Sequence, residues 1–498
     1  DCNEESKNSK SSDSILPPSE VAKSLCQLLQ TFGSNERTCV EKILKELFSS
    51  GDMDMNIAVE LWKIVTECKN DSRNIDAFEG SHKKTSNIGV ALTILTIIAR
   101  SIDDKNTSDA KFALAVHHGL SQEIFTSLDF SSMKSCCMFL QECQPFSIKD
   151  VNSTAETMQE KRNLFDTVTK KLVAIILGNM CEDNEEFTRA WFPACEEAIH
   201  ALFHFHPSAD IVLSTVVTSM YASFAIKNVE ISKQDTENVM CSNARLSRFM
   251  FVLGQVSMNS LVFADKLSQQ AKKFVLMNAK EENAKNMDSS NEEKANEDDA
   301  DMNAAIDADH DNCFLYTTEK SLVLANLLGE FHPIIALVVA NQSNKYSNIL
   351  LRETSILALC KYMCVSSIIC EKYLPLLFTA LENEKIESCC TTIMLAFGDL
   401  MLRFPNSMEA WTPLMYSRLS DEKVVVRYNA LMVLTHLILN DMVKVKGQVA
   451  HVVMCLTDSD SSIADMAHIF FIKLAERSNN PVYNLLGDII SVLSREKE

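Results

Sequence analysis

Apolar residues recur at helical spacing along most of the chain. Near the N-terminus, Leu25, Leu28, Leu29 and Phe32 fall three to four residues apart, and the same spacing is seen in further segments downstream. Glycine (11 residues) and proline (10 residues) are scarce for a chain of 498 residues, so helices with short connections are favoured over strands and turns. The pattern predicts an all-α protein.

Breaks in this periodicity divide the chain into four parts. Residues 1–14 are polar and are predicted to be disordered, and residues 15–278 are predicted to form N-terminal helical repeats. Residues 279–311 are rich in Asn, Asp, Glu and Ala and are expected to form a disordered acidic insert. Residues 312–498 are predicted to form a second set of helical repeats.

The C-terminal third carries a countable repeat. Leu381, Leu419 and Leu456 each open a polar turn rich in acidic residues, at spacings of 38 and 37 residues, and each turn precedes a helical pattern with small or apolar residues in register. An earlier copy fits around Leu351–Leu359. A helix–turn–helix unit of this length is at the short end of HEAT repeats, and such units bury each other's apolar faces. The sequence therefore predicts an α-solenoid of HEAT-type repeats.

The net charge of −20 argues against a DNA-binding surface that covers the whole protein. The charge is uneven, however: residues 280–311 hold 12 acidic and 3 basic residues. This insert is expected to be either a passive spacer or a site for a basic partner such as a histone tail. Lys266, Lys272 and Lys273 form the candidate DNA contact, and the alternative interpretation is a solvated helix face.

Enzymatic chemistry is not predicted. No two glycines lie closer than Gly80 and Gly89, which excludes the glycine-rich loops that hold phosphates and the strained turn that presents a nucleophilic serine. No catalytic residues, cofactor or small-molecule substrate are therefore expected. The histidines at 200, 204 and 206 are spaced as weak candidate zinc ligands, but no further ligand is evident, so no metal site is predicted.

The seventeen cysteines include no CxxC pair and fall on apolar faces, which indicates reduced core thiols rather than disulfides. No signal peptide and no apolar run of about 20 residues is evident, so neither a membrane span nor a membrane partner is expected. The chain begins with Asp1 rather than Met, which suggests a processed form or a fragment.

Long strings in the second half resemble a known family. They include RLSRFMFVLGQVSMNSLVF, LRETSILALCKYMCVSS, FGDLMLRFPN and VVVRYNALMVLTHLILNDMVKVKGQV. Over roughly residues 245–494 the chain is similar to condensin complex subunit 1, the HEAT-repeat subunit of condensin I. Val445 stands where the condensin II counterpart typically carries tryptophan, which favours condensin I.

The resemblance implies a non-enzymatic subunit that binds the kleisin, docks near an SMC ATPase head and helps the complex to compact chromosomal DNA in mitosis. It implies a nuclear and mitotic-chromosome location, with a cytoplasmic pool. The loop that contacts the SMC head in the family corresponds here to Lys444, Val445, Lys446, Gly447 and Gln448. An ordinary inter-helix turn is the alternative interpretation of this loop.

A HEAT solenoid of another class, such as a transport receptor or a phosphatase scaffold, is the alternative function. It would share the repeat period but not the MVKVKGQ loop or the RFPN and YNLL strings.

Overall fold

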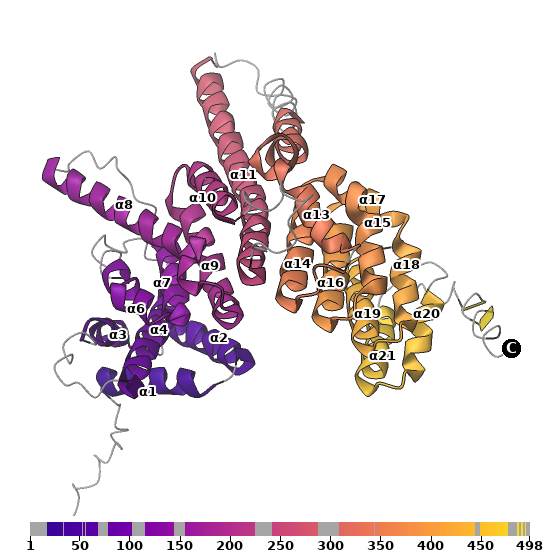
Figure 1. Ribbon diagram of the computed structural model, residues 1–498, viewed down its shortest axis with the longest axis horizontal. Helices are drawn as coiled ribbons and strands as arrows, with labels where there is room; N and C mark the ends of the chain where they lie inside the picture. Colours follow the sequence, from indigo (N-terminus) through magenta and orange to yellow (C-terminus); the bar gives the residue numbers. More distant parts are fainter. Residues whose placement is uncertain are drawn as a thin grey trace, which may run out of the picture. The chain divides into compact units, whose positions relative to one another are not determined.

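The computed structural model describes residues 17–32, 34–51, 53–54, 56–67, 78–101, 115–143, 155–224, 242–286, 308–342, 344–443, 449–476 and five further positions between 486 and 494. Every regular element in these ranges is a helix, which confirms the predicted all-α class (Figure 1). The chain divides into two compact units, residues 1–209 and 210–498.

The first unit is built from helices whose apolar faces meet in a common core. α4 packs against α7, and α7 packs in turn against α9. Trp191 of α9 is fully buried, and its indole N–H donates to the carbonyl oxygen of Ile175 at 2.6 Å, at the end of α8. The helices are α1 (Pro18–Thr31), α2 (Ser34–Ser50), α3 (Asn56–Glu67), α4 (Phe78–Ser101), α6 (Gln122–Thr126), α7 (Phe130–Glu142), α8 (Ala155–Leu177), η1 (Asn179–Cys181) and α9 (Glu185–Phe205).

The second unit begins with α10 (Ala209–Phe224) and the 44-residue helix α11 (Asn243–Asn286). A helix that starts at Ala308 continues as a π-helix, η2 (Thr317–Ala325), and a 3₁₀ turn, η3 (Leu327–Glu330), follows. The remaining helices are α13 (His332–Ala340), α14 (Ile349–Val365), α15 (Ser367–Asn383), α16 (Glu387–Arg403), α17 (Pro405–Glu409), α18 (Thr412–Ser417), η4 (Arg418–Ser420), α19 (Val424–Leu439), α20 (Val449–Met454), η5 (Cys455–Thr457) and α21 (Ser461–Ala475).

The predicted repeat is present in this unit. Each repeat has a first helix (α13, α15, α17–α18 and α20) and a second helix (α14, α16, α19 and α21). The second helices begin at Ile349, Glu387, Val424 and Ser461, at intervals of 38, 37 and 37 residues. α14 packs on α16, α16 on α19 and α19 on α21, so each repeat buries the apolar face of its neighbour, as in an α-solenoid.

Small residues set how closely neighbouring second helices approach. A Cβ added at Gly254 of α11 would lie 2.9 Å from the Cα of Ala358 in α14, and one at Gly398 of α16 would lie 3.0 Å from a methyl group of Val433 in α19. α11 thus stacks on α14 as α16 stacks on α19.

One described stretch, Asn243–Asn278 of α11, is long and apolar enough to cross a membrane, which differs from the expectation that no such stretch exists. Of the 18 most apolar consecutive residues in this stretch, 61% are buried inside the protein. Because α14 covers it, its hydrophobicity is that of a core helix.

The four expected domain limits remain predictions, but two helix ends differ from the expected limits of the acidic insert. α11 continues to Asn286, past the expected start of the acidic insert at residue 279. The next described helix begins at Ala308, before the expected end of the insert at residue 311. The segment 1–14 and most of the insert lie outside the described residues.

Twelve of the fourteen described cysteines are buried, as expected for core thiols; Cys39 and Cys313 are exposed. Burial raises the pKa of Cys370 and of Cys389 to about 12, so these thiols stay protonated at neutral pH.

Candidate functional site

The turns between the first and second helices of successive repeats place three carboxylates in the same register. Glu384, Asp421 and Asp458 follow each other at 37 residues, just before α16, α19 and α21. A carboxylate at this place accepts backbone N–H groups of its own turn and lies near the positive end of the following helix. Glu384 accepts from the backbone of Lys385 at 2.9 Å, Asp421 from Lys423 at 3.0 Å and Asp458 from Asp460 at 2.9 Å.

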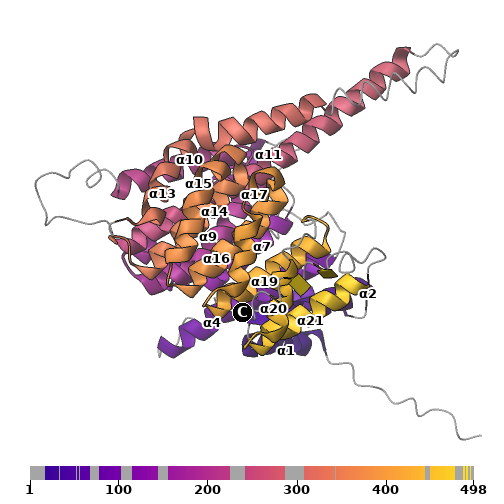
Figure 2. The same cartoon turned by 90° about the vertical axis from the view of Figure 1, so that its right-hand side faces the viewer.

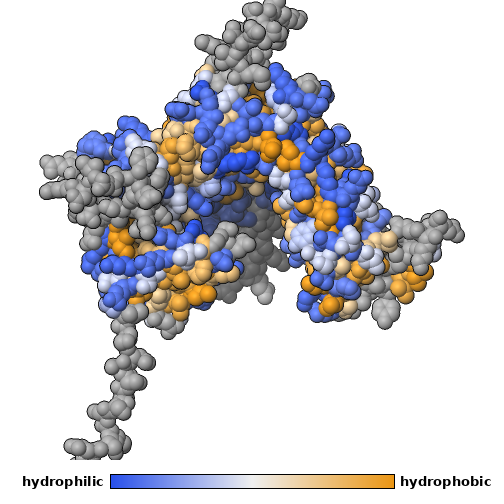
Figure 3. All heavy atoms as spheres, turned by 60° about the horizontal axis from the view of Figure 1, so that its bottom comes forward, coloured by the Kyte–Doolittle hydropathy of each residue, from blue (hydrophilic) through white to orange (hydrophobic). Residues whose placement is uncertain are grey.

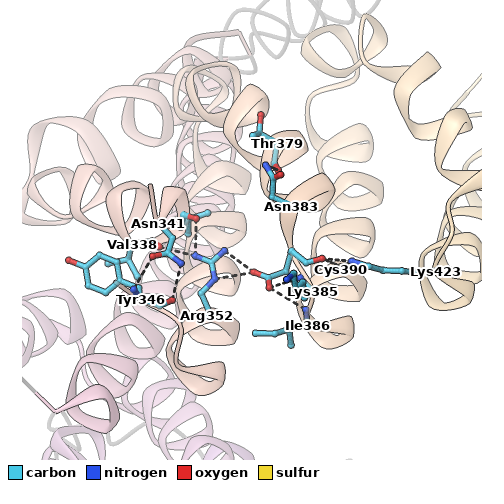
Figure 4. Close-up of polar contacts among 12 residues, drawn as sticks. Val338, Asn341, Tyr346, Arg352, Thr379, Asn383, Lys385, Ile386, Cys390 and Lys423 are labelled. Atoms are coloured by element: carbon cyan, nitrogen blue, oxygen red, sulfur yellow. Dashed lines mark hydrogen bonds and ion pairs between the residues drawn. The ribbon is translucent and has the colours of Figure 1, made fainter. Parts of the chain in front are cut away.

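Arg352, the fourth residue of α14, links its own repeat to the next one (Figure 4). Its guanidinium donates two hydrogen bonds to Glu384 Oε2, at 3.0 Å from Nε and 2.8 Å from Nη2. Nη1 donates to the carbonyl oxygens of Val338 and Val339 at the end of α13, both at 2.9 Å. Both charged side chains are buried, so one cation joins the end of a first helix to the turn of the following repeat.

Arg427 repeats this arrangement at the fourth residue of α19. Its Nε and Nη2 donate to the two oxygens of Asp458 at 2.8 and 2.9 Å, and its Nη1 donates to the carbonyl oxygens of Asp421 and Glu422 at 3.0 and 3.2 Å. Arg427 and Asp458, with Asp421, Cys455 and Ser459, also line a small polar pocket of about 320 Å³.

The repeat between these two lacks the arginine. The fourth residue of α16 is Cys390, and a lysine from the next repeat compensates. Lys423 Nζ donates to the carbonyl oxygen of Glu384 and lies 3.5 Å from Cys390 Sγ. Arg418 Nη1, also from the next repeat, pairs with Asp421 at 3.3 Å. We call Arg352–Glu384, Lys423–Glu384 and Arg427–Asp458 the inter-repeat bridges.

The inter-repeat bridges lower the pKa values of the carboxylates that they contain. Hydrogen bonds from Arg427 hold the pKa of Asp458 below its ordinary value of 3.8. Burial raises the pKa of Glu384, but hydrogen bonds from Arg352 and from the backbone of Ile386 outweigh it, so this pKa lies below its ordinary value of 4.5. Both groups are therefore ionised at neutral pH.

The second helices also present a row of equivalent apolar residues. It consists of Leu357, Leu395, Met432 and Ile469, each the ninth residue of its helix. Leu395 is 42% exposed and Ile469 58% exposed, whereas Leu357 and Met432 are partly buried. Figure 3 shows that orange apolar surface remains between hydrophilic residues on the C-terminal unit, in the right half of the view. We call this set the apolar row.

The loop Lys444–Gln448, expected to contact an SMC head, lies outside the described residues, but its N-terminal anchor is described. Asp441 takes a left-handed conformation (φ 58°), and the amides of Met442 and Val443 donate back to the carbonyl oxygen of Leu437 at 2.9 and 3.3 Å. The loop joins α19 to α20, at the end of α19 opposite to the inter-repeat bridges. Along the 16 residues of α19 the two ends are separated by about 24 Å.

The candidate DNA contact lies on the distal half of α11. Lys266 and Lys273 are exposed and fall seven residues apart, on one face of the helix. Lys272 is partly buried and already takes part in another interaction within the protein.

The three histidines of α9 and its C-terminus do not converge. His200 Nδ1 lies 3.6 Å from Glu197, His204 Nε2 bonds the carbonyl oxygen of Cys143 at 2.9 Å, and His206 Nδ1 accepts from the amide of Ser208 at 3.0 Å. Across the described ranges, no three His, Cys, Asp or Glu side chains are grouped to hold a metal ion.

Known proteins resemble this chain over most of its length. Residues 389–498 match the family model of the non-SMC mitotic condensation complex subunit 1. The chain is 30% identical to condensin-1 complex subunit CAP-D2 of Arabidopsis thaliana, covering 96% of this chain and 33% of the relative. It is 29% identical to condensin complex subunit 1 of Saccharomyces cerevisiae (96% and 40%) and 27% identical to that of Homo sapiens (92% and 32%).

The chain thus spans about a third of the length of these relatives. Among solved structures, Kap121p matches with a TM-score of 0.30 at 12% identity, over 96% of this chain and 51% of that one. An engineered protein matches with a TM-score of 0.26 at 11% identity, over 91% and 98%. Similarity at this level carries no argument about function.

The buried bridge at Arg352 should contribute strongly to stability. We predict that Arg352→Met lowers the free energy of unfolding by about 3–5 kcal/mol, because Glu384 and two carbonyl oxygens lose a buried cationic partner. The matched control is Arg418→Met, which breaks a pair with the exposed Glu382 and a shorter one with Asp421, for which we expect about 1 kcal/mol. Urea unfolding followed by circular dichroism measures both, and equal losses would contradict the assignment.

The lowered pKa values of these carboxylates predict that the free energy of unfolding depends on pH. As pH falls, the unfolded chain binds protons first at Asp458 and Glu384, so their stabilisation is present above pH 5 and is lost as pH drops through their folded pKa values. We expect the urea midpoint to fall between about pH 5 and pH 3, and to fall less steeply in Asp458→Asn. Parallel slopes in the two proteins would show that Asp458 contributes nothing.

Proposed function

Because this chain belongs to the condensin complex subunit 1 family, we propose that it is a non-enzymatic HEAT-repeat scaffold within a condensin complex on chromosomes in the nucleus. Two binding roles follow from this proposal: a kleisin segment occupies the apolar row, and the Lys444–Gln448 loop contacts an SMC ATPase head. The observation that carries the proposal is the apolar row, which repeats in register across four helices.

The spacing of the row suits an extended peptide. Packed helices lie about 8–10 Å apart, and an extended peptide in the polyproline II conformation advances about 3.1 Å per residue and presents every third side chain on the same side. A peptide that crosses the second helices would therefore place a side chain over a new helix at about every third residue. We infer that the kleisin segment carries apolar residues at this interval.

Polar residues that border the apolar row indicate where the peptide would lie on the second helices. One turn further along each second helix lie Lys361, Asp399, His436 and Lys473, a set of polar residues that borders the apolar row. Leu357 is partly buried, and α14, which carries it, also packs against α11. We therefore place the kleisin segment on α16, α19 and α21.

The loop that we propose as the head contact follows the C-terminal end of α19, away from the inter-repeat bridges. The left-handed turn at Asp441 ends α19 and directs the chain into the Lys444–Gln448 loop. Two lysines around one apolar valine could meet carboxylates on a partner surface, and Gly447 allows a turn that other residues disfavour. The alternative of a HEAT adaptor of another class is favoured by no described feature.

We predict that Leu395→Asp combined with Ile469→Asp weakens kleisin binding by at least about tenfold, because charges would replace apolar anchors. The matched control is Leu337→Asp, an exposed leucine on the first helix α13. Co-elution with the kleisin of the same condensin at moderate salt measures the effect, with circular dichroism to verify the fold. If the double variant co-eluted like the unchanged chain, the kleisin would bind elsewhere.

We predict that Lys444→Glu combined with Lys446→Glu weakens binding to an isolated SMC head while leaving the helical content unchanged. The control is Lys42→Glu with Lys45→Glu, an equal charge change at two exposed positions of α2. Binding at two salt concentrations separates a specific contact from a general charge effect. Unaltered head affinity in the loop variant would exclude this role for the lysines.

A further inference from the structure

The distal half of α11 and the helix from Ala308 to Ala325 form a paired extension of the second unit. Figures 1 and 2 show the two helices side by side, reaching beyond the stacked repeats. Ser268 Oγ and His310 Nδ1 share a hydrogen bond of 2.8 Å that joins them. We call this two-helix element the arm.

The arm leaves large apolar side chains in solvent. Leu267 and Phe274 lie seven residues apart and Met277 three residues further, so the three follow one stripe of α11. They are 49%, 66% and 63% exposed, whereas the proximal part of the same helix, Phe249–Val256, is buried. Such a stripe normally faces another helix.

The second helix of the arm adds to this apolar surface. Leu315 and Tyr316 are both more than half exposed. Lys320 Nζ lies 5.8 Å from the centre of the Tyr316 ring, a cation–π distance, so aromatic and cationic groups are neighbours here as well.

Two lysine side chains lie beside the apolar stripe. Lys266 and Lys273 each precede a stripe residue by one position, and both are exposed. The acidic side chain of Asp265 accepts a hydrogen bond from Gln269 on the same helix, at 2.8 Å. A stripe of apolar residues with flanking lysines complements a helix that has apolar residues seven apart with flanking carboxylates.

We propose that the arm is a docking site for an acidic amphipathic helix of another protein, which packs on Leu267, Phe274 and Met277 and pairs with Lys266 and Lys273. From Leu267 to Met277 the stripe covers about 15 Å, or three helical turns. Nucleic acid is disfavoured, because a phosphate backbone would leave the apolar side chains of Leu267, Phe274 and Met277 uncovered. This site does not depend on the kleisin or head contacts.

Fluorescence anisotropy with synthetic peptides tests the proposal. The probe is a labelled 21-residue helical peptide with leucine at heptad positions a and d and glutamate at e and g; the control peptide carries lysine at e and g. We expect the whole chain to bind the glutamate peptide and to bind the lysine peptide at least about tenfold more weakly. Leu267→Asp with Phe274→Asp should remove binding, and Leu337→Asp should not.

The charge reversal Lys266→Glu with Lys273→Glu gives an independent readout, because it should invert the preference in favour of the lysine peptide. Since all four substituted side chains are exposed, thermal unfolding should be unchanged. Equal affinity for both peptides, or full binding by the Leu267→Asp and Phe274→Asp variant, would overturn the proposal. Loss of binding to a 30-base-pair duplex in the lysine variant, without peptide binding, would replace it by a DNA contact. A concentration-dependent dimer abolished by Phe274→Asp would replace it by self-association.

Discussion

The arrangement of the C-terminal repeats depends on two arginine side chains, one buried (Arg352) and one partly buried (Arg427), that join consecutive repeats. Arg352 and Arg427 each contact the repeat that they belong to through backbone carbonyl oxygens and the next repeat through a carboxylate. Apolar burial between helices is non-directional and tolerates sliding. A guanidinium held by four hydrogen bonds is not tolerant of sliding, because any shift would leave a charge or a carbonyl group unsatisfied. The bridges therefore fix the register, and the register aligns the apolar row.

The repeat could be predicted from the sequence because its period is carried by short turns with acidic residues at fixed positions. Leu381, Leu419 and Leu456 mark those turns, and the structure confirms second helices at the same intervals. The compensation at Cys390 could not be predicted, since Lys423 comes from another repeat and only the three-dimensional stacking brings its ammonium group there. His200 and His204 were only weak candidate zinc ligands by their spacing, and their rings contact different partners.

The arm shows a second limit of prediction from composition. The change from apolar to acidic residues near Ala279 was expected to end the helical region, yet α11 continues for eight residues, because alanine, glutamate and lysine are good helix formers even without an apolar face. Loss of hydrophobic periodicity therefore does not mark where the helix ends, and the exposed Leu267, Phe274 and Met277 show that the periodicity itself continues beyond the buried part of α11. For the Lys444–Gln448 loop, the proposed head contact depends on the family resemblance, and only the entry of the loop at Asp441 is described.

The fixed register of the repeats and the exposed apolar row together affect how a ligand can bind. The bridges lie at the N-terminal ends of the second helices, the Lys444–Gln448 loop follows the C-terminal end of α19 in sequence, and the apolar row lies along the middle of the second helices. A ligand that spans several second helices would contact repeats whose spacing the bridges already set, so less conformational entropy is lost on binding than for a flexible array. Where Cys390 replaces arginine, Lys423 makes the bridge instead, beside a hydrogen bond from Asn429 to Thr391 at 3.2 Å. Because lysine lacks the planar fork of arginine, this bridge holds fewer acceptors than the two arginine bridges do.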